Sequence, residues 1–248
     1  MKKWIEYIFR AYRYRYKLDV NEISYIINNI NKGDIVVDIG AHKGGYLYWM
    51  KKKVKQKGKV YAFEPQEELF LELNELYNLK KANNLTIENL GVSNEESEVE
   101  FFIPKTKEGN SPGARITCLD DVGLHQKTII KTTTLDQYFL KHNIHPNFIK
   151  IDVEGHEKNV LLGGVNLIKL CKPKILIECE NRHLKEGDIF DVFQILFDLG
   201  YSGYFFENRT RKSINNFKVD IHQKIRKARF WQAKEYINNF IFEPTIIS

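Results

Sequence analysis

The pattern of apolar and polar residues changes near residue 31. Residues 1–30 place aromatic and aliphatic side chains at helical spacing, among them Trp4, Tyr7 and Ala11, which predicts one or two helices ahead of the core. Beyond residue 31, short β-rich apolar runs alternate with longer helix-compatible stretches. This alternation is typical of βαβ units, so we expect an α/β domain over residues 31–248, built on a mostly parallel sheet and preceded by a helical segment.

The apolar runs predict strands at residues 35–39, 60–64, 85–90, 99–103, 128–133, 148–153, 174–179, 204–206 and 239–242. Helices are predicted after the first strand and at 66–81, 135–141, 157–169 and 190–199. Residues 104–127 are rich in Gly, Pro, Ser and Thr without clear periodicity, which predicts a loop or insertion. Because long loops often act as lids, this loop is a candidate substrate lid.

Length and composition fit one domain with an appended segment, since 248 residues with 43% hydrophobic side chains can bury one substantial core. Cys118, Cys171 and Cys179 are scattered without a C-x-x-C pair, so we expect neither a disulfide framework nor a structural zinc site, and a reducing, cytoplasmic setting. No apolar stretch is long enough for a transmembrane segment. The net charge of +6 fits either a solvated basic surface or an acidic partner.

A glycine-rich turn follows the first predicted strand, in the segment VDIGAHKGG at residues 37–45. Glycines permit a sharp turn and close approach of the backbone to a ligand. Glu64 ends the next predicted strand, where a carboxylate can accept both hydroxyl hydrogens of a ribose. Together these features predict an adenosine site, against the alternative that Asp38 only caps a helix and Glu64 is solvated.

The absence of complete NAD and ATP motifs indicates which nucleotide the glycine turn suits. His42 stands where G-x-G-x-x-G requires its second glycine, which disfavours NAD, and the chain has no P-loop motif for ATP. Asp38 can receive the positively charged amino group of a methionine moiety. The turn therefore suits S-adenosylmethionine, a sulfonium without phosphate.

Six segments between about residues 33 and 180 resemble the FkbM-type methyltransferases, in that family's order and spacing: VDIGAHKGG (37–45), YAFEPQ (61–66), ENLGVS (88–93), TLDQYF (134–139), FIKIDVEGHEKNVLLGG (148–164) and ILIECE (175–180). The IDVEGHE segment after TLDQYF is the most specific. The resemblance implies a Rossmann-like class I methyltransferase fold, with a mostly parallel seven-stranded sheet and helices on both faces. It also implies an S-adenosylmethionine-dependent O-methyltransferase that acts on a hydroxyl of a sugar, glycan or natural product.

Carried over by position, the resemblance places the methionine part of the cofactor at the first turn, the ribose at Glu64 and the adenine at the turn 89–91. The family often has Asn at the position of His42 and an apolar residue at the position of Lys43. At these two positions the methionine contacts of this chain depart from the family pattern. The predicted cofactor contacts are Asp38, Gly40, Ala41, His42, Gly44, Glu64, Pro65, Asn89, Gly91 and Asp152.

Methyl transfer to an alcohol requires the acceptor oxygen close to the methyl group and a base for its proton. Asp152, Glu154 and His156 follow one predicted strand and Glu178 ends its neighbour, so these four are the candidate catalytic residues. Asp152 ranks first by its place near the cofactor, then Glu154, then His156, whose ordinary pKa suits a base near neutral pH. Alternatively, His156 caps the helix that starts at 157, and Glu154 serves that helix dipole.

Several alternatives stay open at this stage. The carboxylates could bind Mg²⁺ or act without a metal, and the sequence does not decide between these two cases. Arg182 and His183 could reach substrate. The basic segments 209–212 and 224–231 could attract a phosphate or an anionic glycan, or could simply be solvated. The aromatic and basic ladder at 12–17 could stack on bases, lie at a membrane surface or pack on the sheet.

Two other functions compete with the O-methyltransferase. A nucleic-acid methyltransferase is favoured by a pI near 9.0 and by the ladder at 12–17, and opposed by the absence of a base-methylation motif or an RNA-binding module. A scaffold that keeps the fold without turnover is opposed by the intact set Asp38, Gly40, Glu64 and Asp152. Neither the acceptor nor the oligomeric state follows from the sequence.

Overall fold

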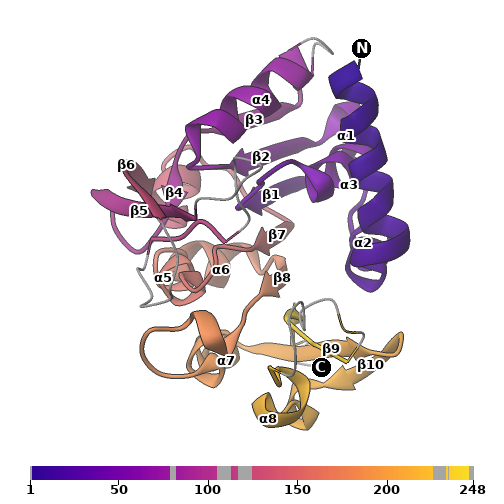
Figure 1. Cartoon of the computed structure of the whole chain (residues 1–248), viewed down its shortest axis with the longest axis vertical. Coiled ribbons are helices and arrows are strands. Elements are labelled where there is room, and N and C mark those ends of the chain that lie inside the picture. The colour runs from indigo at the N-terminus through magenta and orange to yellow at the C-terminus, as the bar shows by residue number, and fades with distance from the viewer. Residues whose placement is uncertain are drawn as a thin grey trace.

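The computed structural model describes residues 2–78, 82–104, 113–116, 125–225, 233 and 235–245. In these residues the main sheet has eight strands in the order β10-β9-β11-β8-β7-β1-β2-β3 (Figure 1). The central strands from β8 to β3 are parallel, and β11 runs antiparallel to both of its neighbours. The strand bounds are β1 Ile35–Ile39, β2 Lys59–Phe63, β3 Leu85–Glu88, β7 Phe148–Ile151, β8 Lys174–Glu178, β9 Tyr201–Glu207, β10 Thr210–Ser213 and β11 Asn239–Pro244.

Helices cover both faces of this sheet because its central strands are apolar on both sides. In β1, Val36 belongs to one hydrophobic cluster and Val37 to the other. The first cluster is completed by α1 Lys2–Arg13, α2 Val20–Asn29, α3 Gly45–Val54 and α4 Glu67–Asn78. The second is completed mainly by the π-helical turn η3 Asp136–Leu140, α5 Glu157–Leu162, α6 Val165–Cys171 and α7 Ile189–Asp198. The short helix α8 Val219–His222 lies near the C-terminal end of the chain.

The N-terminal segment forms α1, a π-helical turn η1 (Tyr14–Leu18) and α2, which confirms the prediction of one or two helices. Tyr7 and Ala11 are fully buried against the sheet side of the molecule. In the described part of the chain, no helix has the length and apolar character needed to cross a membrane.

The predicted loop 104–127 is too long at its C-terminal end. Residues 125–127 belong to β6 (His125–Thr133), which pairs antiparallel with β5 (Glu98–Pro104) from His125 opposite Pro104 onward. With β4 (Gly91–Val92) these strands form a small second sheet. Within the candidate lid, residues 105–112 and 117–124 lie outside the described residues, and Cys118 is one of them.

Two further differences from the predicted elements have local causes. The eighth strand exists because β9 and β10 form a hairpin, whose turn residues Asn208 and Arg209 both have positive φ, 48° and 66°. Such turns usually carry glycine, so the Asn-Arg pair gave no turn signal. The helix predicted over 157–169 is two helices, because the chain turns at 163–164. A side chain at Gly163 would place its Cβ 2.0 Å from the carbonyl oxygen of Ser93.

Candidate functional site

The fold brings the predicted polar residues to one edge of the sheet. Asp38 lies in β1, and Glu64, Asp152 and Glu178 lie at or just after the ends of β2, β7 and β8. These four strands are parallel neighbours, so their carboxyl ends lie along one edge of the sheet (Figure 1). This edge is where open α/β sheets bind ligands.

Glycine at position 40 lets the tips of β1 and β7 approach closely. Gly40 has φ +80°, and a Cβ there would lie 1.8 Å from the backbone oxygen of Asp152. The backbone N–H groups of Gly40 and Ala41 both donate to the carbonyl of Phe63 at 3.0 Å. The first turn is therefore held between the two neighbouring strand ends.

The next two glycines of the motif face the N-terminal segment. A Cβ at Gly44, where φ is +74°, would lie 2.8 Å from the ring of Tyr7. A Cβ at Gly45 would lie 3.0 Å from the ring of Tyr14. The need for glycine at both positions is thus explained by helix packing, a contact that the sequence motif alone did not indicate.

Glu64 is a buried carboxylate held by backbone donors. Its Oε2 accepts a hydrogen bond from the N–H of His42 at 2.6 Å, and its Oε1 accepts one from the N–H of Gln66 at 2.9 Å. Burial raises the pKa of Glu64 to about 7 in spite of these two bonds. The side chain of Asn89 donates to the carbonyls of Glu64 and Pro65, both at 3.0 Å, and so ties the loop after β3 to the tip of β2.

His42 has φ +47°, a left-handed conformation that few side chains adopt readily and that Asn tolerates best. Its Nε2 is buried and has no hydrogen-bond partner among the described residues. Burial, with the nearby charge of Lys43, lowers the pKa of His42 to about 4. Gly91, the last residue of the predicted adenine turn, lies in β4 and pairs with Thr132 of β6.

A buried lysine links two of the predicted carboxylates. Lys150 is 2% exposed, and its Nζ lies 3.0 Å from Asp152 Oδ2 and 3.8 Å from Asp38 Oδ1. Burial alone would lower the pKa of Lys150, but Asp152 and Asp38 together raise it above its ordinary value. Sequence reasoning missed Lys150, although a lysine between two isoleucines of a buried strand was a usable signal.

Asp38 is fully buried, and neither of its carboxylate oxygens has a hydrogen-bond partner in the described part of the chain. Burial raises its pKa to about 6, and the charge of Lys150 opposes that rise. Buried polar atoms are nearly always hydrogen-bonded in folded proteins. These two oxygens are therefore suited to a positively charged hydrogen-bond donor from a ligand.

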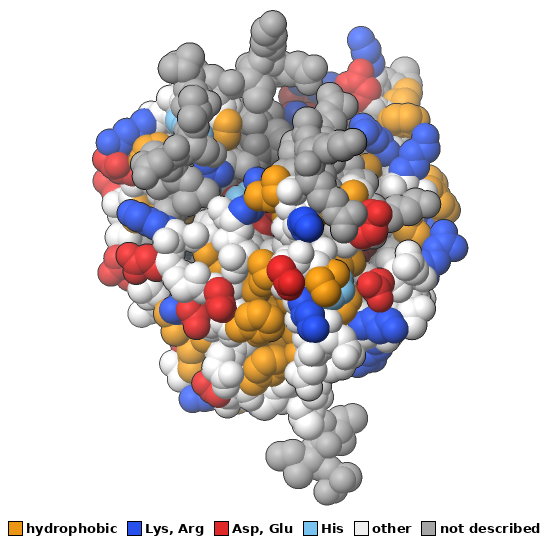
Figure 2. Space-filling model, turned by 60° about the horizontal axis from the view of Figure 1, so that its bottom comes forward, with side chains coloured by type: hydrophobic (Ala, Val, Ile, Leu, Met, Phe, Trp, Pro, Cys, Tyr) orange, Lys and Arg blue, Asp and Glu red, His pale blue; other side chains and the backbone are white. Residues whose placement is uncertain are grey.

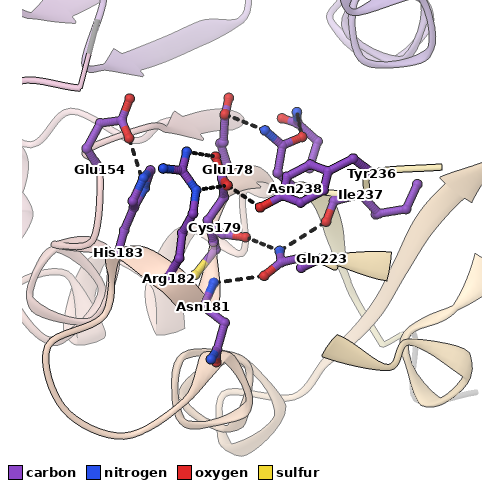
Figure 3. Close-up of polar contacts among 12 residues, drawn as sticks. Glu154, Glu178, Cys179, Asn181, Arg182, His183, Gln223, Tyr236, Ile237 and Asn238 are labelled. Carbon is purple, nitrogen blue, oxygen red and sulfur yellow. Dashed lines mark hydrogen bonds and ion pairs between the residues drawn. The ribbon is translucent and has the colours of Figure 1, made fainter. Parts of the chain in front are cut away.

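Glu154 pairs with a histidine from the neighbouring strand end (Figure 3). Its Oε2 lies 2.9 Å from Nδ1 of His183, which is 5% exposed. Glu154 and Gly155 both have positive φ, 54° and 99°, and a Cβ at Gly155 would lie 2.2 Å from the carbonyl oxygen of His183. The glycine of the IDVEGHE segment thus allows the loops after β7 and β8 to lock together.

His156 occupies a different environment from His183. It is buried, its Nε2 lies 2.9 Å from Ser93 Oγ, and burial lowers its pKa to about 4. His156 is the N-cap residue of α5, as the alternative reading expected, but its side chain makes no capping hydrogen bond.

The end of β8 is joined to the chain before β11 by polar contacts (Figure 3). Asn238 donates to Glu178 Oε1 at 2.6 Å. Burial, with the charges of Asp152 and Glu154, holds the pKa of Glu178 well above its usual range. Arg182, which could reach substrate, pairs with Glu180, with Nε 2.6 Å from Oε2, and Tyr236 donates to the same carboxylate.

No group of three His, Cys, Asp or Glu side chains within the described ranges could hold a metal ion. A surface groove of about 620 Å³ lies elsewhere, lined by residues that include Glu95, Glu96, Asp136 and Lys141. None of the strand-end carboxylates lines this groove, so it is not the candidate site. Most of the basic segment 224–231 lies outside the described residues.

Three comparisons with known proteins bear on this edge of the sheet. The methyltransferase FkbM domain matches residues 38–202. Hexuronic acid methyltransferase AglP of Haloferax volcanii is 28% identical over 167 residues, which cover 66% of this chain and 63% of that relative. The chain thus spans less than two thirds of the length of this curated relative.

The crystal structure of Methyltransferase FkbM from Methylobacillus flagellatus superposes with a TM-score of 0.54 at 16% identity, over 98% of this chain and 55% of that one. It shows the shared fold. The family match covers more than half of the chain and contains the strand-end residues Asp38, Glu64, Asp152 and Glu178. This chain therefore belongs to the FkbM methyltransferase family.

Proposed function

We propose that this chain is an S-adenosylmethionine-dependent O-methyltransferase whose acceptor is a hydroxyl of a sugar or glycan. The observation that carries the proposal is the buried carboxylate of Asp38, whose oxygens lack a hydrogen-bond partner among the described residues, next to Glu64 on the adjacent strand end. Family membership supports methyl transfer, and the relative named as a hexuronic acid methyltransferase supports a saccharide acceptor.

The residues present fit this cofactor. Asp38 would receive its ammonium group, and Glu64 would receive its ribose hydroxyls. Each oxygen of Glu64 accepts one backbone hydrogen bond and keeps a further lone pair for a hydroxyl. Asn89 holds the loop beside which the adenine would lie. When bound, S-adenosylmethionine supplies an electrophilic methyl group on a sulfonium.

The acceptor would then lie on the side of β1 that faces β7 and β8. The strand order β3-β2-β1-β7-β8 places the nucleoside residues toward β3, so the tips of β7 and β8 face the remaining space. Asp152, Glu154, Glu178 and His183 lie there. Carboxylates at these positions can accept hydrogen bonds from the several hydroxyls of a sugar and so orient it.

Within this acceptor half, His183 is the best placed proton acceptor. The carboxylate of Glu154 at its Nδ1 fixes the ring and the tautomer, and leaves Nε2 to take the proton that the acceptor hydroxyl loses. Glu154 thus acts through His183 as a positioning residue. Asp152 is paired with Lys150, and Nε2 of His156 bonds to Ser93. We therefore rank His183 ahead of both as the base.

On the face shown in Figure 2, the charges do not favour nucleic acid as the acceptor. Figure 2 shows Lys and Arg side chains interleaved with Asp and Glu over the described part of one face, although the chain carries a net charge of +6. Nucleic-acid-binding proteins gather their basic residues in a patch or stripe.

The test is methyl transfer from labelled S-adenosylmethionine to a panel of neutral sugars, amino sugars and hexuronic acids, alongside calorimetric titration of the cofactor. The expected result is saturable cofactor binding, weakened by Glu64→Ala, and label incorporated into at least one saccharide. Cofactor binding without turnover on any acceptor would favour a scaffold. Absence of cofactor binding would overturn the proposal.

A further inference from the structure

The first helix is apolar on two opposite sides. Tyr7 and Ala11 are buried in the core. On the other side Ile5 is 61% exposed and Phe9 72% exposed, with Tyr12 one turn further at 38%. Residues at i, i+4 and i+7 share one face of a helix. The outward face of α1, at the periphery of the molecule in Figure 1, is therefore an apolar stripe.

The stripe continues past the helix. Tyr16 and Leu18 in η1 are 62% and 45% exposed, and the ring centroids of Tyr12 and Tyr16 lie 6.0 Å apart. We call these five residues (Ile5, Phe9, Tyr12, Tyr16 and Leu18) the outer stripe. Contiguous exposed apolar surface of this kind marks an interaction site more often than scattered single residues do.

Basic side chains border the outer stripe. Lys2, Arg13 and Lys17 are exposed on the same segment, where Glu6 is the acidic neighbour. On the adjoining helix α3, Lys52 Nζ lies 5.2 Å from the ring centroid of Trp49. The border is thus mainly positive, which complements an anionic surface.

The geometry favours a lipid surface over single-stranded nucleic acid. Base stacking needs free aromatic faces. The ring of Tyr12 instead packs 5.2 Å from that of Trp49, and the guanidinium of Arg15 lies 4.6 Å over the same indole. The Arg15 guanidinium also lies 5.2 Å from the ring centroid of Tyr16, and Ile5, which is 61% exposed, has no stacking face. Apolar side chains with a basic border are the pattern of a helix that lies in a membrane interface.

We propose that the outer stripe docks this protein on an anionic lipid bilayer, with α1 lying in the plane of the interface. Its consequence for catalysis rests on the proposed function. The opposite side of the same segment touches the cofactor loop, through Tyr7 at Gly44 and Tyr14 at Gly45. Docking therefore holds the candidate site beside the membrane, where a membrane-anchored acceptor would be presented to it.

The test is sedimentation of the full chain with vesicles of phosphatidylglycerol and phosphatidylcholine, and with phosphatidylcholine alone. The wild type is expected to bind the anionic vesicles, and to bind less at high salt. The double variant Ile5→Ser/Phe9→Ser is expected to weaken vesicle binding at least about tenfold. It removes one aliphatic and one phenyl side chain that would insert into the bilayer interface. The matched control is Leu170→Ser, which removes a 64% exposed leucine from α6.

Unfolding by urea should give the same midpoint for wild type and double variant, since both substituted side chains are exposed. Failure of the wild type to bind anionic vesicles, or equal binding by the double variant, would overturn the proposal. So would a stripe-dependent dimer in analytical ultracentrifugation without lipid binding, or stripe-dependent binding of a single-stranded oligonucleotide instead. Vesicle binding is measured without cofactor, so its result does not depend on whether the proposed methyltransferase activity is correct. Turnover of a soluble acceptor by the double variant is expected to stay at the wild-type level.

Discussion

Replacing the buried carboxylate Asp38 with an amide should make the protein more stable and worse at binding its cofactor. The pKa of Asp38 rises from 3.8 to about 6 on folding, mainly through burial. A carboxyl whose pKa is raised in the folded state favours folding fully below pH 4, and this contribution is lost as pH rises through 6. At pH 8 the loss amounts to about 3 kcal/mol, taken from 1.36 kcal/mol per pKa unit.

Asp38→Asn removes the ionisation and keeps the shape. We therefore expect the variant to exceed the wild type in free energy of unfolding by up to about 3 kcal/mol at pH 8 and by almost nothing at pH 4. Urea unfolding at several pH values between 4 and 8 measures this difference. Calorimetry at pH 8 should show cofactor binding weakened by about tenfold to a hundredfold, since a charge-assisted hydrogen bond is lost.

The result that refutes this reasoning is an Asp38→Asn protein less stable than the wild type at pH 8. It would mean that Lys150, 3.8 Å away, stabilises the carboxylate more than burial destabilises it. A difference in stability that does not change between pH 4 and pH 8 would contradict the assignment of the titration to Asp38.

Three further predictions follow from neighbouring contacts. Lys150→Met should destabilise the protein by about 3–5 kcal/mol at pH 8, because it leaves Asp152 and Asp38 without their buried cation. The loss should be clearly smaller at pH 5, where Asp38 is protonated. Urea unfolding at both pH values checks this, and an equal loss at both would contradict it. His183→Gln should lower kcat about a hundredfold to ten-thousandfold with unchanged cofactor affinity, whereas the exposed control His145→Gln should not. A His183→Gln variant that keeps the wild-type kcat would remove His183 as the base. Gly155→Ala should lower the free energy of unfolding by about 2–4 kcal/mol in urea, because φ is +99° and the added Cβ would meet the His183 carbonyl. An unchanged urea midpoint would show that the loops after β7 and β8 move apart at little cost.

The N-terminal segment links the two proposals. Its inner side packs Tyr7 against Gly44 and Tyr14 against Gly45, and Asp19 accepts a hydrogen bond from Tyr46 at 2.9 Å. The ring of Tyr46 in turn lies 4.6 Å from Lys150 Nζ. A chain of direct contacts therefore joins the N-terminal segment to the Asp38 and Asp152 carboxylates.

The sequence by itself determined the strand ends and their chemistry. An apolar run followed by a glycine turn is a local pattern, set by backbone sterics and by burial on both faces of a strand. Asp38, Glu64, Asp152 and Glu178 therefore fall on the predicted edge of the sheet. Local patterns failed where a turn lacked glycine, as at Asn208 and Arg209, and where glycines interrupted a helix at 163–164.

Only the tertiary structure decided which of these residues act on one another. Lys150 lies 3.8 Å from Asp38 on the adjacent strand, and His183 meets Glu154 across two loops. Gly44 is small because Tyr7, far away in the sequence, packs on it. Such pairings depend on which strand ends and helices become neighbours, and the long-range packing of the whole core decides which ones do. The turn at each strand end, in contrast, depends only on the few residues within it.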